Sequence, residues 1–238
     1  MLCIVNCKCN SQIAPLGIDT PNPAFSWQLI TDERNVLQKS FHVVVTTGEN
    51  LDKIVWDSSK VNSDNSIAVV YLGLPLKSCS EYAWFVEVED SNGKTVKSGL
   101  NHFGTAFMQK GDWSARWISP NSRPLPKEKK ANMAMAMLFP PKKLPDMIPC
   151  SMLHKQFIAT DGIKRVRVYA TAHGVYRLFI NGQRVDDCEL APEFSVYPKV
   201  LFYQTYDATA LVESGKNAIG VILADGWCCG HIGMSGSS

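Results

Sequence analysis

The sequence predicts an all-β protein built from two β-sandwich domains joined by a connector. The 238 residues are enough for two domains of ordinary size. Short apolar or alternating runs recur between turn-forming residues, at the spacing that is typical of sandwich strands. Over residues 1–107 the same pattern gives no sign of a helix of normal length.

Composition and charge exclude several classes of protein. A chain that is 45% hydrophobic, 19% charged and 10% aromatic is typical of a globular protein. Its net charge of +2 is too small for a nucleic-acid-binding surface, so we expect no nucleic-acid partner. No run approaches the roughly 18 apolar residues that span a membrane, and the opening MLCIVNCKCN lacks the pattern of a signal peptide. We therefore expect a cytoplasmic protein without a membrane partner.

Residues 1–107 form the first predicted domain. Its clearest strand is 81–90, where apolar residues on one face alternate with Glu87 and Glu89 on the other. Further strands are predicted at 25–29, 41–47, 54–58, 67–71 and 101–107, with Trp27, Trp56 and Trp84 as core residues. About seven strands in roughly 105 residues indicate an immunoglobulin-like or fibronectin-III-like sandwich.

Residues 108–150 form the predicted connector. They contain seven of the thirteen prolines and 8 basic against 3 acidic residues. A basic run also suits RNA or acidic lipid, but charge runs in proteins are mostly solvated. The composition therefore favours a solvated linker.

Residues 151–238 form the second predicted domain, a jelly-roll-like sandwich. Asn181-Gly182, between the runs 175–180 and 183–185, is a strong signal for a tight hairpin. Asp207 is expected to cap one helical turn. The other predicted strands are 152–157, 164–172, 200–206 and 218–223.

The second domain is predicted to be incomplete. Six strands are fewer than the roughly eight of a jelly roll. We therefore expect an unpaired edge or an apolar surface near residues 219–227, which would favour association.

The eight cysteines are expected to stay reduced, because reductants in the cytosol keep thiols free. Cys3, Cys7 and Cys9 lie close together, but their spacing does not match the paired ligands of a structural zinc site. We therefore predict no metal site from the cysteines.

The chain has no recognisable catalytic motif. It lacks the common nucleophile, metalloprotease, phosphate-binding and dinucleotide-binding patterns. Asp186, Asp187 and Glu189 are the densest acidic group of the second domain, but neighbouring carboxylates on a loop point apart rather than across a glycosidic bond. No catalytic residue is predicted.

Asp225 and Trp227 form the best candidate for a binding site. An indole stacks on the C–H face of a sugar while a carboxylate binds hydroxyls, and calcium can join where several oxygens converge. The alternative, which the residues favour, is that Trp227 closes the end of the sandwich or an interface.

Ordered motifs along nearly the whole chain resemble the N-terminal, non-catalytic region of bacterial α-L-rhamnosidases. In the first domain they are Pro15–Asp19, Asn22–Trp27, Val55–Ser58 with Val61, and Tyr82–Trp84 with Asp90. In the second they are Val168–Ala170, Gly174–Tyr176, Ile180–Val185, Leu190–Pro192, Tyr203–Asp207, Gly215–Gly220 and Asp225–Trp227. The departures from the family pattern are Ala24, Asp186 and Cys228.

The resemblance implies the front part of an inverting glycoside hydrolase that removes terminal α-L-rhamnose from glycosides or polysaccharides. In that family the catalytic carboxylates belong to a later (α/α)6 barrel, so the resemblance assigns no catalytic residue here and implies a chain that is inactive alone. Some relatives use a similar sandwich to bind rhamnose with calcium, which leaves Asp225, Trp227 and Asn181 as candidate carbohydrate-binding residues. A free-standing carbohydrate-binding module and a purely structural pair of β domains remain open.

Overall fold

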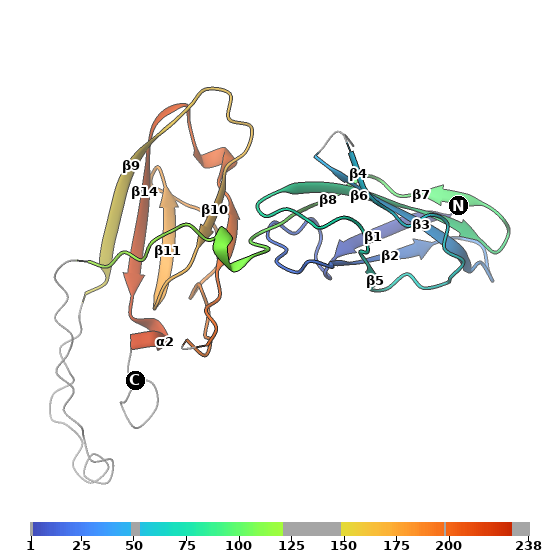
Figure 1. The fold of residues 1–238 in the computed structure, drawn as a ribbon, viewed down its shortest axis with the longest axis horizontal. Coiled ribbons are helices and arrows are strands. Elements are labelled where there is room, and N and C mark those ends of the chain that lie inside the picture. The colour runs from blue at the N-terminus through green and yellow to red at the C-terminus, as the bar shows by residue number, and fades with distance from the viewer. Residues whose placement is uncertain (1, 49–52, 121–148, 198, 230–238) are drawn as a thin grey trace, which may run out of the picture. The chain divides into compact units, whose positions relative to one another are not determined.

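The computed structural model describes residues 2–48, 53–120, 149–197 and 199–229, and it divides into two compact units, Met1–Ala115 and Arg116–Ser238. Each unit consists mainly of strands (Figure 1). Most of the predicted connector, residues 121–148, lies outside the described residues. Among the described residues, no helix is long and apolar enough to cross a membrane.

The first unit is a sandwich of two antiparallel sheets. One sheet has the order β1-β2-β5, and the other has the order β4-β3-β6-β7 with β8 also paired to β6. The strands are β1 (Cys3–Cys9), β2 (Ala24–Ile30), β3 (Gln38–Thr47), β4 (Lys53–Asp57), β5 (Val69–Val70), β6 (Glu81–Asp90), β7 (Thr95–Lys97) and β8 (Asn101–Gly104).

The core of this sandwich lies between the two sheets and is rich in aromatic residues. Alternation along β6 turns Trp84, Val86 and Val88 inward, as predicted, and all three are buried. Phe25 on β2 contacts Trp84 from the facing sheet, with ring centroids 4.5 Å apart. Trp27 is buried as expected, whereas Trp56 is only partly buried against the core.

Two strands of the first unit are absent from the sequence prediction. β1 bears the three clustered cysteines, and its register with β2 shifts between Val5 and Lys8. That irregularity breaks the alternation by which strands are recognised. β7 has only three residues, which is too short for a periodic signal.

The second unit also has two sheets. Among the described residues, a four-stranded sheet has the order β12-β11-β14-β9, and β10 and β13 form a two-stranded sheet. The strands are β9 (Ser151–Ala159), β10 (Arg167–Ala170), β11 (Val175–Ile180), β12 (Gln183–Arg184), β13 (Gln204–Asp207) and β14 (Gly215–Ala224). A 3-10 turn η2 (Thr209–Leu211) and a short helix α2 (Gly226–Cys229) follow β13 and β14 respectively.

The hairpin agrees with the sequence, and the predicted helical turn forms with Ala208 rather than Asp207 at its N-cap position. Asn181 and Gly182 both have positive φ, 50° and 79°, as the tight turn between β11 and β12 requires. Asp207 Oδ1 accepts hydrogen bonds from the backbone N–H and the hydroxyl of Thr209, at 3.0 and 2.6 Å. The strand predicted at 200–206 begins later, at Gln204.

The unpaired edge expected near residues 219–227 is wrong. β14 pairs with β11 on one side and with β9, from Ser151 to Ala159, on the other. The first strand of the unit therefore occupies the place at which a missing strand was expected, and the edges of this sheet are β9 and β12. Large exposed apolar side chains lie instead on β9, where Met152 and Ile158 are both 79% exposed.

Candidate functional site

The structure separates the three candidate carbohydrate-binding residues. Asp225 and Trp227 follow the end of β14, which lies beside the start of β11 because Ala224 pairs with Val175. Asn181 follows the other end of β11, beside Ile219 on β14. Six strand residues separate these ends, a span of roughly 20 Å. Asn181 therefore does not share a site with Asp225 and Trp227.

Hydrogen bonds within the fold account for the side chain of Asn181. Its Nδ2 donates to Leu211 O at 2.9 Å and to Asn217 Oδ1 at 2.8 Å. Its Oδ1 accepts from the backbone N–H of Ala218 at 2.8 Å. This amide ties the β11–β12 turn to β14 and to the segment after η2, which is a structural role.

Aromatic residues gather near Trp227. The half-buried Trp227 lies edge-on to Phe194, with ring centroids 6.3 Å apart, and Phe194 lies edge-on to Tyr197 at 6.2 Å. Phe194 is 60% exposed. It belongs to the irregular segment between β12 and β13, which also exposes Leu190, Val196, Val200 and Phe202. The second unit thus presents ring surface to solvent beside Trp227, and sequence reasoning missed Phe194.

Salt bridges hold the acidic group at the start of that segment. Glu189 Oε2 lies 2.6 Å from Arg177 Nη2, and Glu189 Oε1 lies 2.8 Å from Arg184 Nη1. These two guanidinium groups, Arg184 foremost, lower the pKa of the Glu189 carboxyl. Burial raises the pKa of Asp186 instead. Glu189 thus anchors the start of this loop.

A buried tyrosine pair secures the other end of the same segment. The hydroxyls of Tyr176 and Tyr206 lie 2.9 Å apart. The Tyr176 hydroxyl also lies within donating distance of two acceptors, Ala170 O at 3.1 Å and Gln204 Oε1 at 2.9 Å. Gln204 Nε2 donates to Pro192 O at 3.3 Å. Burial raises the pKa of Tyr206 to about 12 and raises that of Tyr176 as well, so both phenols stay neutral.

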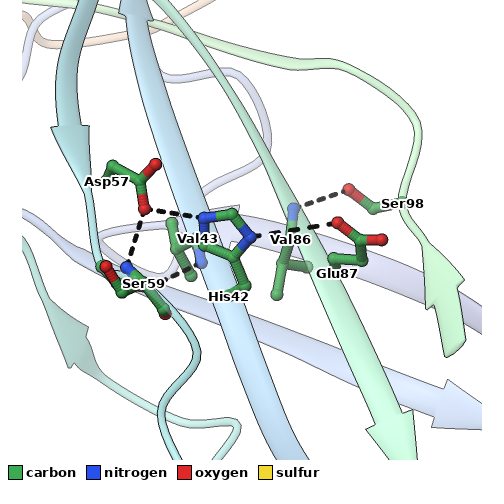
Figure 2. A network of polar contacts seen from close by, with 8 residues as sticks. His42, Val43, Asp57, Ser59, Val86, Glu87 and Ser98 are labelled. Carbon is green, nitrogen blue, oxygen red and sulfur yellow. Dashed lines mark hydrogen bonds and ion pairs between the residues drawn. The ribbon is translucent and has the colours of Figure 1, made fainter.

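The first unit contains a polar network that crosses three strands (Figure 2). His42 on β3 lies between two carboxylates, with Nε2 2.7 Å from Asp57 Oδ1 on β4 and Nδ1 3.9 Å from Glu87 Oε2 on β6. Asp57 Oδ1 also accepts the backbone N–H of Ser59 at 2.7 Å, which together with His42 lowers the pKa of Asp57. The register that places His42 opposite Glu87 is not encoded locally, so sequence reasoning missed this network.

Metal-ligating side chains do not cluster in the described part of the chain. No group of three or more His, Cys, Asp or Glu residues in the described part of the chain is arranged to hold a metal ion. Cys9, from the clustered cysteines, lies in the core of the first unit, where burial raises its pKa to about 12.

Fold and site together define a protein of two successive β-sandwiches with an exposed aromatic loop region on the second. Residues 4–109 match the family model of the Rha78A-like, N-terminal immunoglobulin domain, and residues 161–238 match that of the α-L-rhamnosidase N-terminal domain. The chain therefore belongs to the N-terminal region of the α-L-rhamnosidase family.

Individual relatives agree over nearly the whole chain. An α-L-rhamnosidase of Formosa agariphila is 32% identical over 92% of this chain, and one of Streptomyces avermitilis is 28% identical over 90%. The solved α-L-rhamnosidase structure from Dictyoglumus thermophilum has a TM-score of 0.79 at 32% identity over 94% of this chain, and the one from Aspergillus terreus has 0.81 at 25% over 100%.

The chain corresponds to a small part of these relatives. It spans 23% of the Formosa agariphila protein, 22% of the Streptomyces avermitilis protein and 25% of each of the two solved chains. The matched part is N-terminal, so the catalytic domain of the relatives lies outside the residues of this chain.

Proposed function

We propose that this chain is the non-catalytic front of an α-L-rhamnosidase that hydrolyses terminal α-L-rhamnose from glycosides or polysaccharides. Its two sandwiches support a catalytic (α/α)6 barrel that follows in the longer protein and help to shape access to the substrate. The observation that supports this best is the match of both sandwiches, in order, to relatives named as α-L-rhamnosidases over 90% or more of the chain. Neither nucleic acid nor a membrane is among the proposed partners.

Hydrolysis of an aryl α-L-rhamnoside tests this assignment. The purified 238-residue chain is incubated with the substrate beside the full-length Formosa agariphila relative as positive control. We expect turnover by the relative and none by the chain, because the chain matches only the N-terminal domains and 23% of the length of the relative. Turnover that scales with the concentration of this chain would contradict the proposal.

Within this function, we propose that the second sandwich contacts sugar through Trp227, Phe194 and Asp225. The support is the exposed ring surface of Phe194 beside the indole of Trp227, since aromatic faces stack on the C–H faces of sugars. We leave Asn181 out of this proposed site, because its amide makes hydrogen bonds within the fold.

Isothermal titration with L-rhamnose tests the sugar contact, with glucose as the blank and with calcium or a chelator added in turn. We expect selective binding that Trp227→Ala and Phe194→Ala abolish and that the control Trp113→Ala in the first unit leaves unchanged. Equal heats for rhamnose and glucose would favour the second candidate function, a purely structural pair of β domains. Selective rhamnose binding, together with a native protein whose mass is that of this chain alone, would favour a free-standing carbohydrate-binding module.

We also propose that the protein is cytoplasmic. Seven cysteines are described as free thiols, which suits a reducing compartment. They lie at positions 3, 7, 9, 79, 150, 188 and 228. Cell fractionation with mass-spectrometric detection of this chain would test the location.

A further inference from the structure

A thiol and an imidazole meet at the end of the second unit, where β11 begins and β14 ends. Cys228 Sγ lies 3.6 Å from His173 Nδ1, which is within hydrogen-bonding distance for sulfur. Cys228 is half-buried on α2, and His173 is exposed just before β11. This pair belongs to none of the networks described above, and neither residue is part of a metal cluster among the described residues.

The backbone of the two strands brings the pair together. Gly174 lies so close to Ala224 O that a side chain at this position would collide with the carbonyl. Gly226 has φ of +54°, and a Cβ there would lie 2.7 Å from Val175 Cγ1. The two glycines thus allow the segments that hold His173 and Cys228 to approach each other.

A tryptophan restricts the imidazole further. The Trp117 and His173 rings lie with centroids 4.5 Å apart and planes inclined at 43°. Trp117 thus packs against the imidazole while the two glycines allow the close backbone approach, and in this arrangement His173 Nδ1 lies towards the thiol.

We propose that Cys228 is a histidine-activated thiol and a modification site for low-molecular-weight disulfides. The Cys228 proton passes to His173 Nδ1, and the thiolate is the nucleophile in thiol–disulfide exchange. The thiolate attacks one sulfur of the disulfide RSSR, a new S–S bond forms at Cys228, and the other half leaves as the thiolate RS⁻. The reaction consumes no further oxidant, because the disulfide is the oxidising partner.

Cys188 in the same unit is the matched control. It is exposed, so reagents reach it, but its surroundings disfavour the thiolate. Desolvation raises the pKa of Cys188, and the nearby carboxylate of Asp186 raises it further. Cys188 therefore has carboxylates nearby that disfavour its thiolate, whereas Cys228 has an imidazole within hydrogen-bonding distance.

The test measures the rate of thiol–disulfide exchange with 5,5′-dithiobis(2-nitrobenzoic acid) on the 238-residue chain. The chain carries Cys229→Ser, so that peptide mass spectrometry assigns the adduct to Cys228 and not to its neighbour. We expect Cys228 to react at least about tenfold faster than Cys188 at pH 7. His173→Gln removes the base and should lower the Cys228 rate about tenfold while the Cys188 rate stays unchanged. Equal rates at the two cysteines, or a Cys228 rate that His173→Gln leaves unchanged, would overturn the proposal.

A pH profile decides the question even where His173→Gln does not fold. The rate of an ordinary thiol falls about tenfold per pH unit below its pKa, because the thiolate fraction falls by that factor. The ratio of the Cys228 rate to the Cys188 rate should therefore rise as the pH is lowered from 8 to 6. A ratio that stays constant over this range would show that the imidazole does not activate Cys228.

Discussion

The central strands β6 and β14 provide a direct comparison of the two sandwiches. Each has ten residues and pairs with strands on both sides. Six residues of β6 are buried, whereas Asn217 is the one fully buried residue of β14, all of whose residues are described. Full backbone pairing therefore does not ensure that the faces of a strand are covered.

The difference follows from what covers each sheet. In the first unit, β1, β2 and β5 lie over the sheet of β6, and the buried cluster includes fifteen described residues. In the second unit, the described cover of the four-stranded sheet is the two-stranded β10–β13 pair, and the buried cluster includes five described residues. The described part of the first sandwich therefore has a larger buried core than the described part of the second.

The largest expected effect is on the core of the first sandwich. Trp84→Ala removes a fully buried indole, so we expect a loss of roughly 3–5 kcal/mol in the free energy of unfolding. A urea titration, with unfolding of this unit detected by hydrogen exchange and mass spectrometry, measures the loss in its free energy of unfolding. Trp56→Ala, at a partly buried site, is the comparison and should cost clearly less. Equal losses would mean that burial in β6 does not determine stability.

The tyrosine pair tests whether polar contacts replace apolar burial in the second sandwich. Tyr176→Phe removes the hydroxyl bonded to Tyr206 and leaves a buried phenol with one partner fewer. We expect a loss of about 1–3 kcal/mol in the second unit, measured by urea denaturation. A neutral Tyr176→Phe would contradict the assigned role.

A matched pair of valines sharpens the comparison of the central strands. Val86 on β6 is fully buried, and Val221 on β14 is half-buried. We expect about 2 kcal/mol of destabilisation for Val86→Ala and less than about 1 kcal/mol for Val221→Ala. Chemical denaturation of both variants measures the difference. If Val221→Ala cost as much as Val86→Ala, the second sandwich would be packed as tightly as the first.

The smallest effect is local and concerns Glu189. The Arg184 and Arg177 guanidinium groups lower the pKa of Glu189, so the folded state favours the ionised carboxyl. The stabilisation is present at pH above the ordinary pKa of glutamate and is lost as the pH falls through the lowered one. Glu189→Gln should therefore speed hydrogen exchange in residues 186–190 at pH 7 and have little effect in strong acid. Unchanged exchange at pH 7 would show that the salt bridges do not hold this loop.

The strands that the sequence predicted best are those whose periodicity is strong and whose ends are marked by turns. β6 and β11 match their predicted ranges because alternating burial and the following turns, Ser91–Gly93 and Asn181-Gly182, coincide. β1 and β7 were missed because a register shift and short length remove the alternation.

Properties that depend on distant pairing were less predictable. The expected edge at β14 was wrong because the partner on that side, β9, comes from the start of the unit. Asn181 was a plausible sugar ligand by residue type, but its amide is bonded to Leu211, Asn217 and Ala218. The His42 network and the Cys228–His173 pair likewise join residues that are far apart in sequence.

The central claim is that this chain is the N-terminal part of an α-L-rhamnosidase, and a transplant tests it most directly. The matched N-terminal region of the Formosa agariphila relative is replaced by this chain, and kcat/KM is measured on an aryl α-L-rhamnoside beside the same relative without the region. The account predicts that the hybrid is folded and active, whereas the truncated relative loses stability or activity. A hybrid that is folded by circular dichroism but inactive, beside a truncated relative that keeps full activity, would contradict it.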